Sequence, residues 1–495
     1  FLQATWRGDW SSALTYTNGM GNNFYTYPAV SLAWIFTETF KENMPAWISY
    51  GKLRGNIAAL GGDTDPGKIN PGFAFSGYST ANGQNVPIST YSSSSVLQPN
   101  LKPQNKISKE LGLEMRFLNN RVGFDVSVYQ DNTRNQLLDI TTPGESGVST
   151  IFINAGNIQN RGIEISVDAT PVRSKNFSWN TAVNYAVNRN KIIDLYPGRT
   201  EYDLGANIGE ISTWAVVGKS YGTLRTQIHS TAFQAVDGNG KPIDDPRNGL
   251  PILAWRSDSR TAFPARSNQW QDVGDINAKF RGGWDNTFTY KNFSLNVLLD
   301  ANIGGDFVAL SYRYGTHTGV FPNSLQGRDK QNGGIVWTSA YANDGGTYDD
   351  GIIPQGVFAP GQTVDKPGGG TADVGGMTYQ EAYDQGLVEP SHLPQFFYRY
   401  GSSSTGVADY WILKNSWISL RQVALSYAVS PQIYQKLKLR GLSVSAVGRN
   451  LMYLHNTLPY NFNPESNNSN NTAYSGEEGF LPMMRTFVFT IRAAF

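Results

Sequence analysis

Apolar and polar residues alternate without interruption between residues 163 and 169. The odd positions hold Ile163, Ile165, Val167 and Ala169, and the even positions hold Glu164, Ser166 and Asp168. Successive side chains of a β-strand point to opposite faces, so this segment predicts a strand with one apolar and one polar face. We expect the strand to end at Pro171, because proline cannot continue a paired strand.

The same alternation recurs in pairs of segments that are joined by short polar turns. The predicted hairpins join 111–117 to 122–128 through Asn119 and Asn120, 163–169 to 179–187 through 173–176, and 284–290 to 293–301 through Lys291 and Asn292. A further alternating segment covers 487–495. The segment 417–427 carries apolar residues on both faces, so its pattern does not assign a face.

Asparagine and aspartate recur on the polar face of these predicted strands. Asn180, Asn184 and Asn188 share one face of their strand, and Asn296 and Asp300 share one face of another. A buried amide needs several hydrogen-bond partners, so these faces suit a hydrated lumen better than a dry core. We therefore predict that the apolar faces point outward at lipid, as in a membrane barrel.

Short and long connections alternate along the chain. The short turns are those above, and the long polar loops are 61–106, 133–159, 304–408 and 455–482. Structureless loops beyond about 12–15 residues are uncommon in soluble domains. Outer-membrane barrels place short turns in the periplasm and long loops outside. The pattern predicts an all-β transmembrane antiparallel barrel wall of about fourteen strands, with one pair between 204 and 236 and the last strand running inward.

The composition changes this picture little. Charged residues make up 16% of the chain and aromatic residues 13%, against roughly 25% charged residues in soluble domains. This fits a surface shared by lipid and interfacial aromatic rings, and also an aromatic-rich soluble β protein that binds sugars. A run of about 18 apolar residues, as a transmembrane helix needs, is absent, which leaves a barrel as the way to span a bilayer. The net charge of +1 gives no field that favours nucleic acid.

Few residues suggest reaction chemistry. Cysteine is absent, and His229, His317, His392 and His455 are widely separated in the sequence. We therefore predict neither a catalytic site nor a resident metal or cofactor. The segment 237–245 resembles a calcium loop but fails its spacing, and 343–351 is better interpreted as a solvated acidic loop.

Nine motifs resemble, in family order, successive segments of the SusC-like TonB-dependent transporters of Bacteroidetes outer membranes. They are RGDWSS (7–12), YPAVSLAWIFTETF (27–40), KLRGNIAALGG (52–62), NNRVGFDVSVYQDNTRNQLLD (119–139), NAGNIQNRGIEISV (154–167), VGKSYGTL (217–224), AKFRGGWDNTFTYKNFSLNV (278–297), LKNSWISLRQVALSY (413–427) and GRNLMYLHNTLPYNFNPE (448–465). Nine ordered motifs make a specific match, whereas any single one would be weak.

The resemblance implies a fold and a function. Such transporters resemble a barrel of about 22 strands that is filled by a plug domain, contacts TonB and is capped by a SusD-like lipoprotein. Residues 1–495 would then be the C-terminal part of the barrel, with the plug and the first strands outside this sequence. The implied activity is TonB-dependent import of an oligosaccharide or peptide across the outer membrane, without an enzymatic step.

Two other functions stay open at this point. One is a passive porin of fourteen strands, and the other is a soluble carbohydrate-active enzyme. The enzyme would need paired carboxylates and usually a blade repeat of about 40 residues, which we do not find. For an importer, we predict that the loop aromatics Trp337, Tyr341 and Tyr398 contact cargo or cap, because such rings stack on sugars and peptides.

Overall fold

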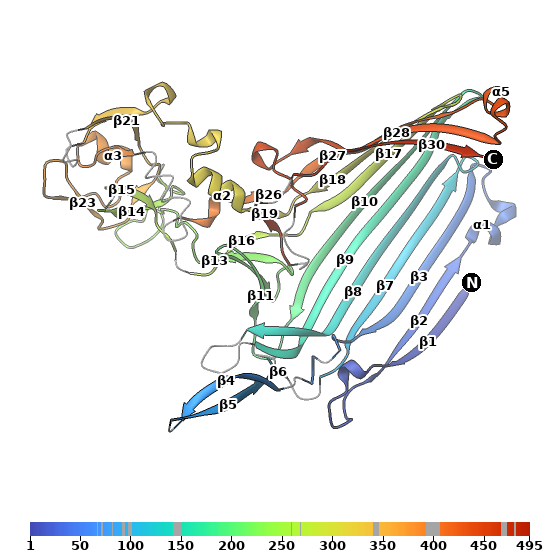
Figure 1. Cartoon of the computed structure of the whole chain (residues 1–495), viewed down its shortest axis with the longest axis horizontal. Coiled ribbons are helices and arrows are strands. Elements are labelled where there is room, and N and C mark those ends of the chain that lie inside the picture. Colours follow the sequence, from blue (N-terminus) through green and yellow to red (C-terminus); the bar gives the residue numbers. More distant parts are fainter. Residues whose placement is uncertain are drawn as a thin grey trace.

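A computed structural model shows that twelve strands of the chain form one curved antiparallel wall (Figure 1). The structure describes residues 1–66, 68–70, 73–81, 83–91, 95–97, 101–141, 150–258, 260–267, 269–339, 346–392, 406–466, 473–479 and 482–495. In order across the wall lie β1 (Leu2–Trp10), β2 (Phe24–Trp34), β3 (Ile48–Gly62), β7 (Gln104–Phe117), β8 (Val122–Thr141), β9 (Thr150–Arg173), β10 (Phe177–Asp194), β17 (Phe280–Tyr290), β18 (Phe293–Ile303), β27 (Trp417–Ala428), β28 (Gly441–Asn456) and β30 (Thr486–Ala494). All the predicted hairpins are present.

The two faces of the wall differ as the alternation predicted. Leu111 pairs with Val128, Val128 with Ile163, and Ile163 with Val187, so one apolar row crosses four strands. Leu111 is 53% exposed and Val128 is 44% exposed. The row is therefore left open to the surroundings of the chain, as a lipid-facing surface is.

The opposite face is polar and carries ion pairs between strands. Arg54 of β3 donates two hydrogen bonds of 2.7 Å to the carboxylate of Asp125 and one of 2.6 Å to Ser127, both on β8. Asn188 of β10 donates to Asn160 of β9 over 3.0 Å. Several of the amides and charges on this face are thus paired between strands.

The expected end of β9 at Pro171 is wrong, because the strand continues to Arg173. Thr170 and Pro171 together stand opposite the single residue Asn180, which makes a β-bulge. Pairing with β8 has already ended at Ala169 and Val122. The sheet therefore needs no backbone hydrogen bond from the nitrogen of Pro171, and the missing N–H is tolerated.

A second bulge explains why the segment 417–427 has no clean pattern. Leu298 pairs with Gln422 and Leu299 with Leu420, so Arg421 is an extra residue in β27. In β27, the residues that point outward are therefore at odd positions after the bulge, such as Leu425, and at even positions before it, such as Leu420. The extra residue changes the phase of the alternation, and both faces then look apolar in the sequence.

The predicted loop 133–159 is also wrong. Strands β8 and β9 stay paired up to Thr141 and Thr150, so only 142–149 connect them. These strands have 20 and 24 residues, whereas a tilted membrane strand needs about 9–11. The hairpin therefore extends beyond the bilayer, where Phe152 and Ile153 pack into small apolar clusters.

The pair of strands predicted between 204 and 236 lies outside the wall. There, β11 (Glu201–Ile208), β12 (Ile211–Val216) and β13 (Thr223–Thr226) form a separate sheet with β16 (Gln271–Asp275). Without that pair, the wall has twelve strands in the described part of the chain, compared with the predicted fourteen. In the same part of the chain, β1 and β30 are the two free edges of the wall.

Much of the predicted loop 304–408 folds into what we call the outer lobe, at the left of Figure 1. The outer lobe consists of β14 (Ile252–Arg256), β15 (Thr261–Pro264), β20 (Ile335–Thr338), β21 (Thr347–Ile352), β22 (Val357–Phe358), β23 (Thr363–Asp365), β24 (Thr371–Asp373), α3 (Tyr379–Asp384) and β25 (Ser391–His392). Leu253, Phe358 and Tyr379 are 0% exposed and form its core. The connection is thus not structureless, because it buries its own apolar side chains.

Smaller elements complete the chain. Between the wall and the lobe lie β19 (Asp306–Ala309), α2 (Leu310–His317), β26 (Ile412–Lys414) and β29 (Gly476–Glu477). The hairpin of β4 (Phe73–Ala81) and β5 (Gln84–Tyr91) projects from the edge of long loops, and β6 (Ser95–Leu97) pairs with β9. At the edge of short turns lie α1 (Phe36–Thr39) and α5 (Pro431–Tyr434), near the end of β30 (Figure 1). No helix in the described ranges is long and apolar enough to cross a membrane.

Candidate functional site

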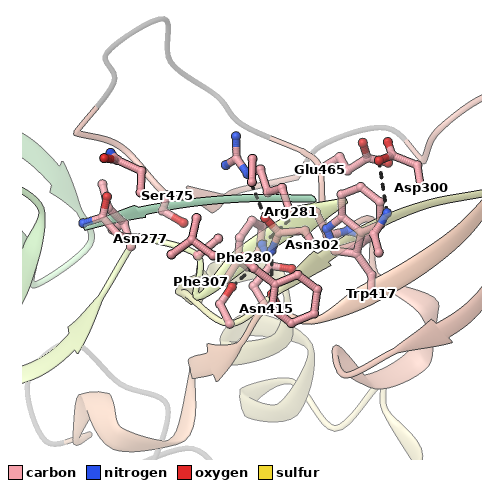
Figure 2. Close-up of a pocket in the computed structure, with 18 of the residues that line it drawn as sticks. Asn277, Phe280, Arg281, Asp300, Asn302, Phe307, Asn415, Trp417, Glu465 and Ser475 are labelled. Carbon is pink, nitrogen blue, oxygen red and sulfur yellow. Dashed lines mark hydrogen bonds between the residues drawn. The ribbon is translucent and has the colours of Figure 1, made fainter. Parts of the chain in front are cut away.

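A pocket of about 790 Å³ lies on the inner face of the wall, where the long loops begin. Strands β10, β17, β18 and β27 form its floor, and the loops after β18 and β28 form its sides (Figure 2). Its position follows from the register of the wall, because β17, β18 and β27 begin or end at the same level, where Phe280 pairs with Ile303 and Asn302 with Trp417. The pocket opens toward the side on which a lumen would lie.

Arg421, the extra residue of the second bulge, organises one side of the pocket. Its guanidinium contacts Asp300 at 2.9 Å and Glu465 at 2.7 Å. Tyr453 also donates a hydrogen bond of 2.8 Å to Glu465. The guanidinium lies 5.4 Å from the ring centre of Trp417, which supports it from below. Charge-assisted bonds of this kind hold the loop after β28 against the wall.

A chain of amides organises the other side. Arg281 donates from Nε to Asn302 over 3.0 Å, and Asn302 donates to the carbonyl of Asn415 over 2.9 Å. Asn415 in turn donates to the carbonyl of Pro464 over 2.9 Å. Figure 2 shows the side chains of Arg281, Asn302 and Asn415 close together. Two long loops are thereby fixed to strands β17 and β18.

Of two polar groups in this amide chain, only the side chain of Arg281 is exposed to a ligand. The Oδ1 atom of Asn415 is buried and accepts no hydrogen bond from the described residues. The side chain of Arg281 is exposed, and within the described ranges no carboxylate lies at ion-pair distance from it. Burial and the charges of Glu478 and Glu477 raise the pKa of Tyr474, which keeps this lining hydroxyl protonated at neutral pH. The pocket can therefore bind an oxygen-rich solute by hydrogen bonds.

The structure does not bring Trp337 into this pocket. Trp337 lies in β20 of the outer lobe, with its ring centre 5.4 Å from Tyr348 and 4.8 Å from His392. Tyr341 and Tyr398 lie outside the described residues. Trp337 as a contact for cargo or cap therefore stays a prediction.

Asp350, which lies in the segment 343–351 interpreted above as a solvated acidic loop, accepts a hydrogen bond from Nδ1 of His392 over 3.0 Å. Within the part of the chain that the structure describes, no cluster of three or more His, Asp or Glu side chains could hold a metal ion.

Sequence reasoning missed most of the pocket. Arg281, Arg421 and Glu465 all lie within the quoted motifs, but only their polarity distinguished them there. Asp300 was recognised as an inner-face residue. The sequence signal that could have identified these pocket residues is a polar side chain at the end of a predicted strand, next to a long loop.

The sequence model of the family described as TonB dependent receptor-like, beta-barrel matches residues 1–248. TonB-dependent receptor P39 of Formosa agariphila is 24% identical over 515 residues, which cover 96% of this chain and 43% of the relative. TonB-dependent receptor SusC of Bacteroides thetaiotaomicron is 27% identical over 339 residues, which cover 65% of this chain and 31% of the relative.

Solved structures show the same fold. The RagAB peptide transporter matches with a TM-score of 0.65 and 17% identity, covering all of this chain and 46% of that one. Its closed-closed state matches with a TM-score of 0.66 and 16% identity. The chain thus spans less than half the length of these relatives.

Proposed function

Because the chain belongs to the TonB dependent receptor-like β-barrel family of the outer membrane, we propose that it forms part of an importer for an oligomeric nutrient. The family consists of receptors and transporters. In the proposed function, the wall encloses a hydrated path, and TonB supplies energy through a plug outside this sequence. No bond of the cargo is broken.

The observation that carries the proposal is the difference between the two faces of the wall. Apolar rows such as the one through Leu111 and Val128 remain open, while the opposite face pairs its charges between strands, as Arg54 and Asp125 do. An outward apolar face and an inward polar face are what a bilayer selects in a barrel with a wet lumen.

The wall needs further strands to close. Unpaired N–H and C=O groups along β1 and β30 would each cost several kcal/mol in lipid. The longer relatives have room for such strands, and we assign the present chain to the C-terminal part of a barrel whose remainder lies outside this sequence.

We assign cargo contact to the pocket and the outer lobe. The exposed side chain of Arg281 offers a cation to a polar solute, which fits both oligosaccharides and peptides. The outer lobe presents Trp337 next to Tyr348 and His392, and aromatic groups of this kind suit a cap or a cargo. A SusD-like lipoprotein is the cap we propose.

Uptake by the complete transporter tests the assignment. Arg281→Gln should slow growth on the cargo and leave barrel yield unchanged, and Trp337→Ala should do the same if the lobe takes part. Lys241→Gln, on an exposed loop, is the control. Unchanged uptake in both variants would remove the two residues from the site.

Purification in detergent tests the partners. A lipoprotein and the plug-bearing portion should copurify with the chain, and finding neither would count against an importer. A passive porin is the second candidate, and it predicts an open pore in a planar bilayer, whereas the importer predicts an occluded one.

A further inference from the structure

Positive charge is concentrated at the edge of the wall that carries the short turns. We define the basic rim as residues 118–121, 173–176, 291–292 and 429–440. The basic rim contains seven cationic residues and no acidic residue: Arg121, Arg173, Lys175, Lys291, Lys436, Lys438 and Arg440. The remaining short connection, 35–47, adds one lysine and two glutamates. Since the whole chain has a net charge of only +1, the rest of the molecule is net negative.

The longest part of the basic rim is amphipathic. It contains α5 and the 3-10 turn Gln435–Leu437 that follows it. Ile433 is 51% exposed and Leu437 is 58% exposed. Lys436, Lys438 and Arg440 are also exposed, and in the described ranges none of the three forms an ion pair. Apolar and cationic side chains are therefore both available at this corner.

An aromatic girdle lies just inside the basic rim. The rings of Trp179 and Phe288 stack at 5.8 Å, and those of Phe293 and Tyr427 lie 4.6 Å apart. Such girdles mark the depth of the membrane interface in barrels. Lys291 lies within three residues of two of these rings in the sequence, and a strand rises about 3.3 Å per residue. Lys291 thus lies within roughly 10 Å of the girdle, at the level of lipid headgroups.

The basic rim also continues the lipid-facing surface. Leu442 and Val444 belong to the outward row of β28, where Val444 pairs with Ile491, a residue that is 73% exposed. Arg440 is also at an even position, two residues before Leu442, and so continues the same alternation. A ligand at this corner therefore lies next to the hydrocarbon-facing strands rather than only beneath the lumen.

We propose that the basic rim binds anionic phospholipid in the periplasmic leaflet of the outer membrane. Short turns of such barrels lie on the periplasmic side. Ile433 and Leu437 enter the boundary between headgroups and acyl chains, and Lys436, Lys438 and Arg440 bind the phosphate groups. The inference rests on the membrane location and is independent of the cargo.

Lipid titration of the complete transporter, purified in detergent, tests the proposal by native mass spectrometry. The probes are phosphatidylglycerol and phosphatidylcholine with the same acyl chains. The variant Lys436→Gln, Lys438→Asn, Arg440→Gln removes three cations, and asparagine is chosen because Lys438 has a positive φ of 59°. The control Lys102→Gln, Lys241→Gln, Lys330→Gln removes three exposed lysines from the long loops.

The wild type should retain phosphatidylglycerol in preference to phosphatidylcholine. The rim variant should bind phosphatidylglycerol about five-fold more weakly for each cation removed, hence about 100-fold for three at low salt, and the control variant should match the wild type. Lys175→Gln with Lys291→Gln gives a second variant on separate turns and should weaken binding by about 25-fold.

Three outcomes would overturn the proposal. The first is equal retention of the two lipids by the wild type, and the second is equal retention of phosphatidylglycerol by the rim and control variants. The third is loss of a copurifying periplasmic protein from the rim variant while phosphatidylglycerol binding persists, which would assign the surface to a protein partner.

Discussion

Replacing Val183 by arginine should destabilise the folded barrel far more than the same replacement at the adjacent Asn184. Val183 lies near the middle of β10, where it pairs with Val167 on one side and Trp284 on the other, and it is 43% exposed. Asn184 points to the opposite face, into a polar hollow lined also by Arg54 and Asp125. The two positions therefore compare lipid and lumen within one strand.

The magnitude follows from the depth of the substitution. An arginine on the lipid face costs about 2–4 kcal/mol near the bilayer midplane, and lumen positions tolerate charge. Because 1.4 kcal/mol is a factor of ten, the folding equilibrium of the Val183 variant should fall roughly 30- to 700-fold relative to that of the Asn184 variant. Val183→Leu, which keeps an apolar side chain, is the control for shape.

The assay is urea unfolding of the complete transporter in lipid vesicles, followed by tryptophan fluorescence and by the gel shift of heated and unheated samples. Equal stabilities of the two arginine variants, or a larger loss at Asn184, would refute the assignment of the two faces. The proposed lumen, its pocket and the lipid contacts of the basic rim would then lose their basis.

Three further expectations concern other parts of the molecule. Asn286 lies in an outward row and accepts a 3.0 Å hydrogen bond from the indole of Trp179. Trp179→Phe should therefore lower the free energy of unfolding by about 1–3 kcal/mol in the same assay, and adding Asn286→Leu should restore most of the loss. A double variant that shows no recovery would contradict the pairing. Arg421→Gln should speed amide hydrogen exchange in the loop after β28, because it removes both carboxylate contacts; an unchanged exchange rate would mean that backbone contacts hold the loop. Hydrogen bonds from Arg247 lower the pKa of Asp245 to about 2. The contact therefore stabilises the loop around Asp245 at pH values above the usual aspartate pKa, and this stabilisation is lost as the pH falls through about 2. Pepsin should therefore cut this loop faster in Asp245→Asn than in the wild type at pH about 4 but not at pH about 2, and equal rates at both pH values would contradict the link.

The turns and faces of the wall could be predicted because they depend on neighbouring residues. Asn119 and Asn120 adopt φ of 56° and 63°, the left-handed conformation that asparagine tolerates better than most residues. The strands themselves follow from a period of two, which is a local property of the backbone.

The pocket could not be predicted in the same way. Arg421 and Asp300 are 121 positions apart in the sequence, and they meet only because β18 pairs with β27 in one register. Glu465 reaches them through a loop whose path depends on Tyr453 and Arg421. The bulge at Arg421 is likewise defined by its partner strand, since an extra residue exists only relative to the strand opposite.

The sequence by itself determined the strands of the three predicted hairpins, which face of each is apolar, and that short and long connections alternate along the wall. The tertiary structure decided how far the strands extend, where bulges reverse their faces, and which polar groups converge at the ends of β17, β18 and β27. The division has a physical cause: alternation is set by each residue's own backbone geometry, whereas register, bulges and pockets are set by contacts between residues far apart in the chain.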